Sequence, residues 1–280
     1  MKRINKLAFF AAAVGILVYC ISCAVMFPTR GNGILTTTAE TVSAFERISS
    51  SGGAEVHFYA GDEYRAVLTI DENIKEYIEV RVEDNVFNIR CKKGHSILPT
   101  KFTVDVYCPV LTGVSISGSG IFKNIDTITA PEFEARISGS GKMEGDIECG
   151  KYSARISGSG KINGDIVCDN YSVAIMGSGK IDGAIECNEY LAKISGSGKI
   201  TTYGNSNNVD ISIRGSGKFD GNELNTKNAT VNISGSGNVN ISIEDSLKAK
   251  ISGSGKITYS GLPEIDSSIS GSGQIKSNNN

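Results

Sequence analysis

A five-residue motif, Ile-x-Gly-Ser-Gly, recurs nine times in the C-terminal part of this 280-residue chain. Its copies begin at Ile116, Ile137, Ile156, Ile175, Ile194, Ile213, Ile233, Ile251 and Ile269. The steps between them run from 18 to 21 residues, and four of the steps are 19. A period of this length, kept over so many copies, predicts repeats that each stack on their sequence neighbours.

Each repeat reads as short strands joined by glycine turns. β-Branched residues alternate with polar ones along the repeat at 154–171, which is the period of a half-buried strand. No segment has the apolar spacing of a helix, and a propeller blade needs about 40 residues. A repeat of about 19 residues at ~3.3 Å each has a perimeter of roughly 60 Å, enough for one three-sided coil. The sequence therefore predicts an all-β fold, a single-stranded parallel β-helix of about nine coils.

The hand of the coil follows from weaker signals. Spacings of 6, 6 and 7 residues between Ile137, Met143, Cys149 and Ile156 approach the hexapeptide period of left-handed helices. The drift to 7 breaks that period, and crossover chirality favours right-handed coils, which we therefore expect.

Stacked coils turn each repeat position into a column of equivalent side chains. We expect one buried column from the motif isoleucines at 137, 156, 175, 194, 213, 233, 251 and 269. A second column should contain Met143, Ile162, Ile181, Ile200, Phe219, Val239, Ile257 and Ile275. A third should contain Ile147, Ile166 and Ile185, with the buried cysteines Cys149, Cys168 and Cys187 two residues further on. The glycines should turn the corners, where φ is positive.

The N-terminal residues 1–28 form a signal peptide or membrane anchor. Lys2, Arg3 and Lys6 precede the uncharged run 7–27, which suits export and is also long enough to span a bilayer. The sequence Ile21-Ser22-Cys23-Ala24 is similar to a lipobox, so Cys23 is the candidate lipidation site. A lipoprotein, an uncleaved anchor and a cleaved signal all remain open, and each exports the rest of the chain to the cell envelope.

The exported part divides into a linker at 29–41, an all-β head at 42–112 and the β-helix at 113–280. The head lacks the repeat, but alternation marks strands at 56–58, 78–82 and 102–106, and Asp84-Asn85 suits a hairpin turn. Because an open end of a β-solenoid exposes apolar side chains and unpaired strands, we expect the head to cap the rod.

The chain resembles a known protein family. The runs Phe45-Glu-Arg-Ile48, Ile78-Glu-Val-Arg-Val82 and Val114-Ser-Ile-Ser-Gly-Ser-Gly120 are similar to the head GIN domain family of auto-transporter adhesins. The resemblance covers about residues 42–275. It implies a β-helical fold, a bacterial cell-envelope location and an adhesive or scaffolding role, and it brings no catalytic residues.

The sequence gives little support for a nucleotide, metal or catalytic site. The Gly-Ser-Gly-Lys copies lack the first Gly and the Ser or Thr of a Walker A motif, so no nucleotide cofactor is expected. Three cysteines in a line cannot surround a metal ion tetrahedrally, so we expect no metal and no catalytic residues. The net charge of −2 gives no reason to expect nucleic acid as a partner.

A basic column stands out on the predicted rod. Lysine follows the motif in six copies, and we take this row as a candidate stripe for a polyanion or acidic glycan: Lys142, Lys161, Lys180, Lys199, Lys218 and Lys256. A solvated face that discourages aggregation is the alternative, with Glu144 and Asp182 near enough to neutralise it.

These observations predict a non-catalytic interaction protein of the cell envelope. Its partners would be the membrane, through the N-terminal segment, and a glycan or surface protein. A self-assembling scaffold, formed as a homo-oligomer, is the alternative. A polysaccharide-active β-helix enzyme is disfavoured, because carboxylate pairs would have to break the repeat on one face.

Overall fold

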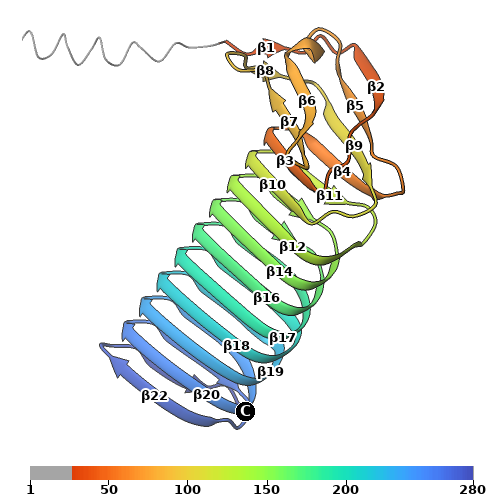
Figure 1. Cartoon of the computed structure of the whole chain (residues 1–280). Coiled ribbons are helices and arrows are strands. Elements are labelled where there is room, and N and C mark those ends of the chain that lie inside the picture. The colour runs from red at the N-terminus through yellow and green to blue at the C-terminus, as the bar shows by residue number, and fades with distance from the viewer. Residues whose placement is uncertain (1–26, 280) are drawn as a thin grey trace, which may run out of the picture.

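The computed structural model describes residues 27–279, which form a rod of stacked β-coils with a strand-rich head at one end (Figure 1). The head contains a 3-10 turn at Lys75–Tyr77 and nine strands. These are β1 (Thr29–Arg30), β2 (Leu35–Thr41), β3 (Arg47–Gly52), β4 (Glu55–Ala60), β5 (Arg65–Asp71), β6 (Ile78–Glu83), β7 (Val86–Cys91), β8 (Ile97–Leu98) and β9 (Phe102–Cys108). None of the described residues belongs to a helix with the length and apolar character needed to cross a membrane.

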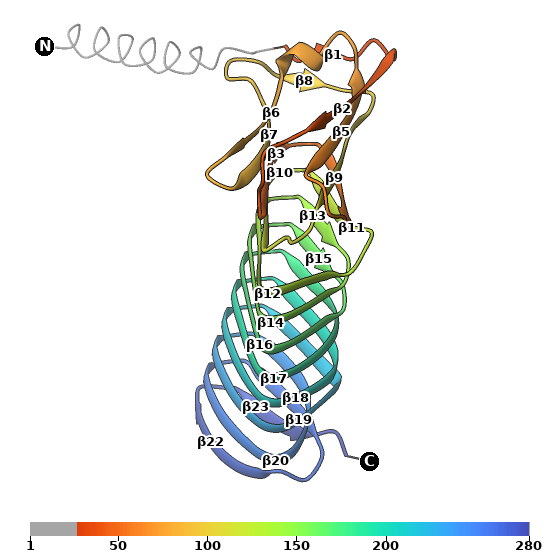
Figure 2. The same cartoon turned by 45° about the vertical axis from the view of Figure 1, so that its right-hand side comes forward.

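The rod is built from fourteen further strands, each pairing in parallel with strands of neighbouring coils (Figure 2). They are β10 (Gly113–Gly118), β11 (Ile121–Asn124), β12 (Ile128–Gly139), β13 (Lys142–Glu144), β14 (Ile147–Gly158), β15 (Lys161–Asn163), β16 (Ile166–Gly177), β17 (Lys180–Gly196), β18 (Lys199–Gly215), β19 (Lys218–Gly235), β20 (Asn238–Gly253), β21 (Lys256–Ser260), β22 (Glu264–Ser270) and β23 (Gln274–Ser277). The predicted parallel β-helix is confirmed.

Each coil has three faces, as its length predicts. In the coil at 151–168 they are a long face (151–158), a lysine face (161–163) and a cysteine face (166–168), and equivalent residues of other coils take the same names. The register is strict, since Ile156 pairs with Ile175 and Lys161 with Lys180. Like side chains therefore stack at the spacing of neighbouring strands, about 4.8 Å.

The predicted apolar columns fill the interior. The motif isoleucines from Ile137 to Ile251 are buried, as are the second-column residues from Met143 to Ile257. Ile269 differs from the expectation because it is 44% exposed: among residues 27–279, no coil covers the outer side of β22. A further column on the long face is a stack of buried rings, which the sequence analysis did not predict: Phe133, Tyr152, Tyr171 and Tyr190.

The two glycines of the motif are required for different physical reasons. Gly177, the first glycine of its copy, has a φ of 120°, and a Cβ there would lie 2.6 Å from the carbonyl oxygen of Gly158 in the preceding coil. The second, Gly179, is buried, and a Cβ there would lie 2.6 Å from Cγ2 of Ile156. The corner thus requires glycine once for backbone conformation and twice for close packing between coils.

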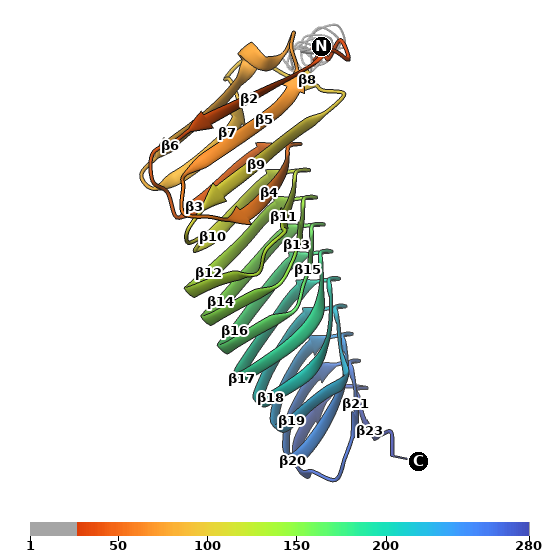
Figure 3. The same ribbon diagram turned by 90° about the vertical axis from the view of Figure 1, so that its right-hand side faces the viewer.

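The head continues the faces of the rod without a break. Strands β3 and β4 pair in parallel with β10 and β11, and β7 and β9 pair in parallel with β3 and β4. Beyond them β2, β5 and β6 run antiparallel and end the stack (Figure 3). The predicted cap is confirmed, and its apolar core is continuous with that of the rod.

One part of the head is an additional coil that the motif search missed. Ser50, Ser51 and Gly52 pair in register with Ile116, Ser117 and Gly118, so they occupy the place of the repeat motif. The motif isoleucine is replaced by the buried Ser50, which hid this coil from a search based on sequence identity.

Residues 29–41, expected as a linker, form β1 and β2 and pair with β8 and β5. Asp71 holds this segment in place. Its buried carboxylate accepts hydrogen bonds from the Thr100 hydroxyl (2.6 Å), the Thr100 amide (2.8 Å) and the Gly33 amide (2.8 Å). Chiefly the bond from the Thr100 hydroxyl, with the amide bonds, lowers the pKa of Asp71 to about 2 against the opposing effect of burial.

The predicted hairpin at Asp84-Asn85 is also confirmed. It joins the antiparallel strands β6 and β7, and both turn residues have positive φ, 50° and 61°. Two such residues in succession are the mark of a type I′ turn, whose twist matches the flanking strands.

Candidate ligand-binding faces

The strand register stacks the candidate lysines in one column on the lysine face. Lys142, Lys161, Lys180, Lys199 and Lys218 follow one another without a gap, Asn238 takes the next place, and Lys256 resumes the column. Five like charges about 4.8 Å apart repel one another unless counter-charges lie close.

Carboxylates form ion pairs with only part of this lysine column. Asp220 lies 3.1 Å from Nζ of Lys218 and 4.0 Å from Nζ of Lys199. In the described part of the chain no carboxylate lies within 4.0 Å of the ammonium groups of Lys142, Lys161 and Lys180. The acidic partner is therefore Asp220 rather than Glu144 or Asp182, and it pairs with only two lysines of the column.

A second feature is an amide-rich corner between the cysteine face and the long face. Its side chains form columns in the coils around 186–189, 205–208 and 225–228. On the long face, Asn208 donates to Glu189 (2.7 Å), Asn228 donates to Asn208 (3.2 Å), and Ser246 donates to Asn228 (2.7 Å). On the cysteine face, Asn225 donates to Asn205 (3.1 Å) and Asn205 donates to Glu186 (2.8 Å).

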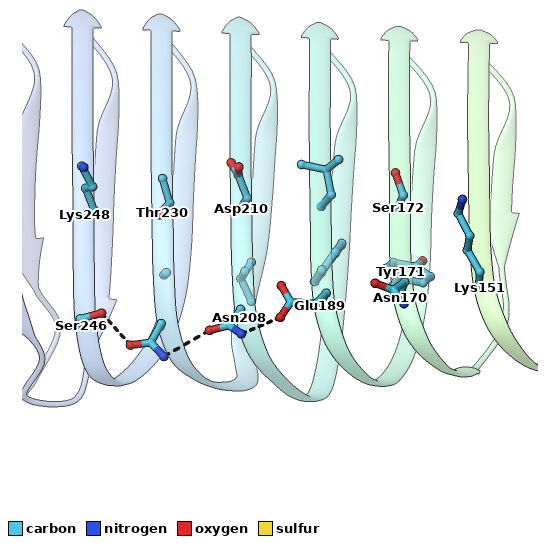
Figure 4. A pocket seen from close by; sticks show the side chains of 15 residues that line it. Lys151, Asn170, Tyr171, Ser172, Glu189, Asn208, Asp210, Thr230, Ser246 and Lys248 are labelled. Carbon is cyan, nitrogen blue, oxygen red and sulfur yellow. Dashed lines mark hydrogen bonds between the residues drawn. The ribbon is translucent and has the colours of Figure 1, made fainter.

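A groove of about 750 Å³ lies on the long face beside this corner, across six coils (Figure 4). One wall is the amide column, from Lys151 to Ser246, and the other is a mixed column from Ser172 to Lys248. Between the walls lie four inward-facing side chains: Tyr171, Tyr190, Val209 and Ala229. The lysine stripe lies on another face, so the structure keeps these two candidate sites apart.

Sequence reasoning overlooked the amide corner because no single repeat shows it. The signal was present as a spacing: Glu186 and Glu189 precede Asn205 and Asn208 by 19 residues, and Asn225 and Asn228 follow after 20. Only alignment of the coils reveals that these residues form columns.

The cysteines line the interior of the cysteine face as predicted. Cys168 and Cys187 are buried, Cys149 is half-buried, and the Cys187 thiol donates to the Ser206 hydroxyl at 3.5 Å. A hydrogen bond with Cys149 together with burial raises the pKa of the Cys168 thiol, and burial raises the pKa of Cys187. Neutral, enclosed thiols of this kind act as small apolar residues.

His57 lies between two carboxylates. Its Nδ1 lies 2.8 Å from Asp105 and its Nε2 lies 3.2 Å from Glu55, which also accepts a hydrogen bond from Lys123 (2.6 Å). These residues belong to three adjacent strands, β9, β4 and β11. The cluster therefore links the head to the first coil of the rod.

Comparison with known proteins supports one family. The model of the family described as "Putative auto-transporter adhesin, head GIN domain" matches residues 44–165 and 161–263. A comparison with curated proteins finds no match.

Among solved structures, a protein from Parabacteroides merdae described as a "putative adhesin" is similar over 90% of this chain and 99% of its own, with 24% identity and a TM-score of 0.73. A second, from Parabacteroides distasonis, has 24% identity and a TM-score of 0.72, covering 90% and 100%. A third, from Parabacteroides distasonis and described as a "putative lipid binding protein", has 28% identity and a TM-score of 0.71, with the same coverage. Because the family model spans most of the described rod and head, the chain belongs to the auto-transporter adhesin, head GIN domain family.

Proposed function

We propose that this protein is a non-catalytic interaction protein of the cell envelope, an adhesin that binds ligands along the sides of its rod. The observation that carries the proposal is the strict coil register, which aligns equivalent outward positions at each step along the rod and repeats lysine in five successive coils of the lysine face. A surface of this kind suits long ligands with a repeating structure, since each further unit meets another equivalent contact. The adhesin description of the family and of its solved members supports the same role.

The lysine stripe is the proposed site for a polyanion such as an acidic glycan. Lys142, Lys161 and Lys180 have no carboxylate within ion-pair distance among the described residues, so their mutual repulsion is relieved by an anionic ligand. Lys199, Lys218 and Lys256 extend the same column toward the C-terminal end. Contacts of this type weaken as salt is added, because exposed charges are screened.

Replacing Lys161, Lys180 and Lys199 together by glutamine is expected to weaken binding of polygalacturonate about tenfold at low salt. Each exposed ion pair contributes roughly 0.2–1 kcal/mol, and three are removed. Calorimetry of the full-length protein in mild detergent, repeated at rising salt, measures the change.

The matched control changes the same charge on another face, through Lys193→Gln, Lys248→Gln and Lys250→Gln, all exposed on the long face. This variant should bind polygalacturonate like the wild type. Equal losses in both variants, or no loss in either, would contradict the assignment of the stripe.

Cys23 is the proposed point of membrane attachment through a lipid, and it lies outside the described residues. Cells grown with a labelled fatty acid should incorporate the label into the wild-type protein and not into Cys23→Ala. Cys20→Ala is the control, because Cys20 lies three residues earlier in the same apolar run and should keep the label. Label retained in Cys23→Ala would place the lipid on another residue, and no label in the wild-type protein would favour an uncleaved anchor or a cleaved signal.

A further inference from the structure

The groove on the long face is built from side chains alone. The strands beneath it, β16 to β20, pair in parallel with the coils on both sides, so their backbone N–H and C=O groups are already used. A peptide strand has no free edge to pair with here, which removes the usual source of affinity for an extended polypeptide. A ligand in this groove must be recognised through the amide, hydroxyl and apolar side chains that line it.

Two side chains of the amide column, Asn208 and Asn228, leave hydrogen-bonding capacity unused. Asn208 and Asn228 each use one of two N–H donors in the column and one acceptor position on the amide oxygen. Each therefore keeps one N–H and one oxygen lone pair for a ligand. Figure 4 shows the chain of bonds from Ser246 to Glu189, which fixes the amide planes before any ligand arrives.

The repeat distance of these groups selects the kind of ligand. Asn208 and Asn228 hold the same position in two neighbouring coils, about 4.8 Å apart along the rod. One pyranose unit of an extended glycan advances by a similar distance and presents hydroxyl groups that both donate and accept. Two successive sugars can therefore meet Asn208 and Asn228 in the same way.

The charge and the apolar lining of the groove further restrict the class of ligand that it can bind. The charged residues of the groove balance, with Lys151 and Lys248 at its two ends and Glu189 and Asp210 between them. A polyanion would meet two carboxylates at the centre of the groove, so an uncharged ligand fits better. Half-buried Leu191 on the mixed wall offers apolar surface to the C–H face of a sugar ring.

We propose that this groove binds an uncharged, extended glycan whose chain lies along the rod, with the amide column of Asn208 and Asn228 contacting its hydroxyl groups. The site is separate from the lysine stripe in position and in ligand charge. Failure of one assignment therefore leaves the other unaffected.

The test uses full-length protein in mild detergent with cellohexaose, a neutral glycan whose chain is extended. Cellohexaose should bind by calorimetry, with affinity that increases from the disaccharide to the hexasaccharide and changes little with salt. The double variant Asn208→Ala/Asn228→Ala should bind that probe about tenfold more weakly, because two hydrogen-bonding side chains are lost.

Asn205→Ala/Asn225→Ala is the matched control. It removes the same residue type from the same two coils, but on the cysteine face and outside the groove. This variant should bind like the wild type, and both variants should melt at similar temperatures because the substituted residues are solvent-accessible. The proposal is overturned if cellohexaose does not bind, if both double variants lose affinity equally, or if neither does.

Discussion

Replacing Gly177 by alanine is expected to destabilise the protein by about 3 kcal/mol or more. The added Cβ would lie 2.6 Å from the carbonyl oxygen of Gly158, and the φ of 120° at Gly177 is unfavourable for any residue with a side chain. Backbone strain of this kind costs about 1–3 kcal/mol, and forced overpacking adds a further ~1–3 kcal/mol. The neighbour is backbone and belongs to a stacked coil, so it cannot move aside without displacing the next corner.

Urea or thermal denaturation followed by circular dichroism measures this effect. Gly61→Ala is the control, because an added Cβ at Gly61 has no atom within 4 Å and the residue is outside the positive-φ region. That variant should unfold like the wild type. If Gly177→Ala were as stable as Gly61→Ala, the corner would not require glycine and the close packing between coils would be refuted.

Deleting residues 34–112 is expected to make the remaining repeats insoluble. The deletion removes β3 and β4, which pair with β10 and β11, and so uncovers the buried side chains of the first repeat coil, such as Val114, Ile116 and Phe122. An exposed apolar coil with unpaired strand edges associates with other chains. Sedimentation of cell extracts and size-exclusion chromatography of the soluble fraction measure the outcome.

Deleting residues 264–280 is the corresponding control at the other end. It removes β22 and β23 and leaves β20 and β21 as the outermost strands, an edge similar to the one that the described structure already presents. This shortened protein should stay soluble with a modestly lower melting temperature, because a stacked array loses one repeat and one interface. A soluble, folded protein without 34–112 would show that the head is not needed as a cap.

The parts of the structure that sequence predicts are those in which the same residue type recurs at the same position. The motif isoleucines and the corner glycines satisfy one steric requirement in every coil, so their spacing alone predicts the faces and the buried columns. The sequence did not predict the coil that the head forms at 50–54. Ser50 replaces the motif isoleucine there, so the backbone path is kept but the sequence motif is lost.

The candidate sites were harder to predict, because they depend on contacts between columns. Asp220 neutralises two lysines, although Glu144 and Asp182 occupy equivalent places in earlier coils. Side-chain reach and rotamer decide which carboxylate makes the pair, and neither follows from spacing. The amide corner likewise requires the exact coil register, since one inserted residue between Asn205 and Asn225 changes the step from 19 to 20.

The hydrogen bonds between coils run along the length of the rod, and this direction has a mechanical consequence. A protein held at the envelope by its N-terminal end and pulled by a bound cell would bear the load on these bonds end-on, one coil after another. Bonds loaded in this direction break one coil at a time, starting from the coil that takes the force, whereas bonds loaded in shear fail together. Each released coil adds about 60 Å of extended chain, so the rod would lengthen in steps under tension.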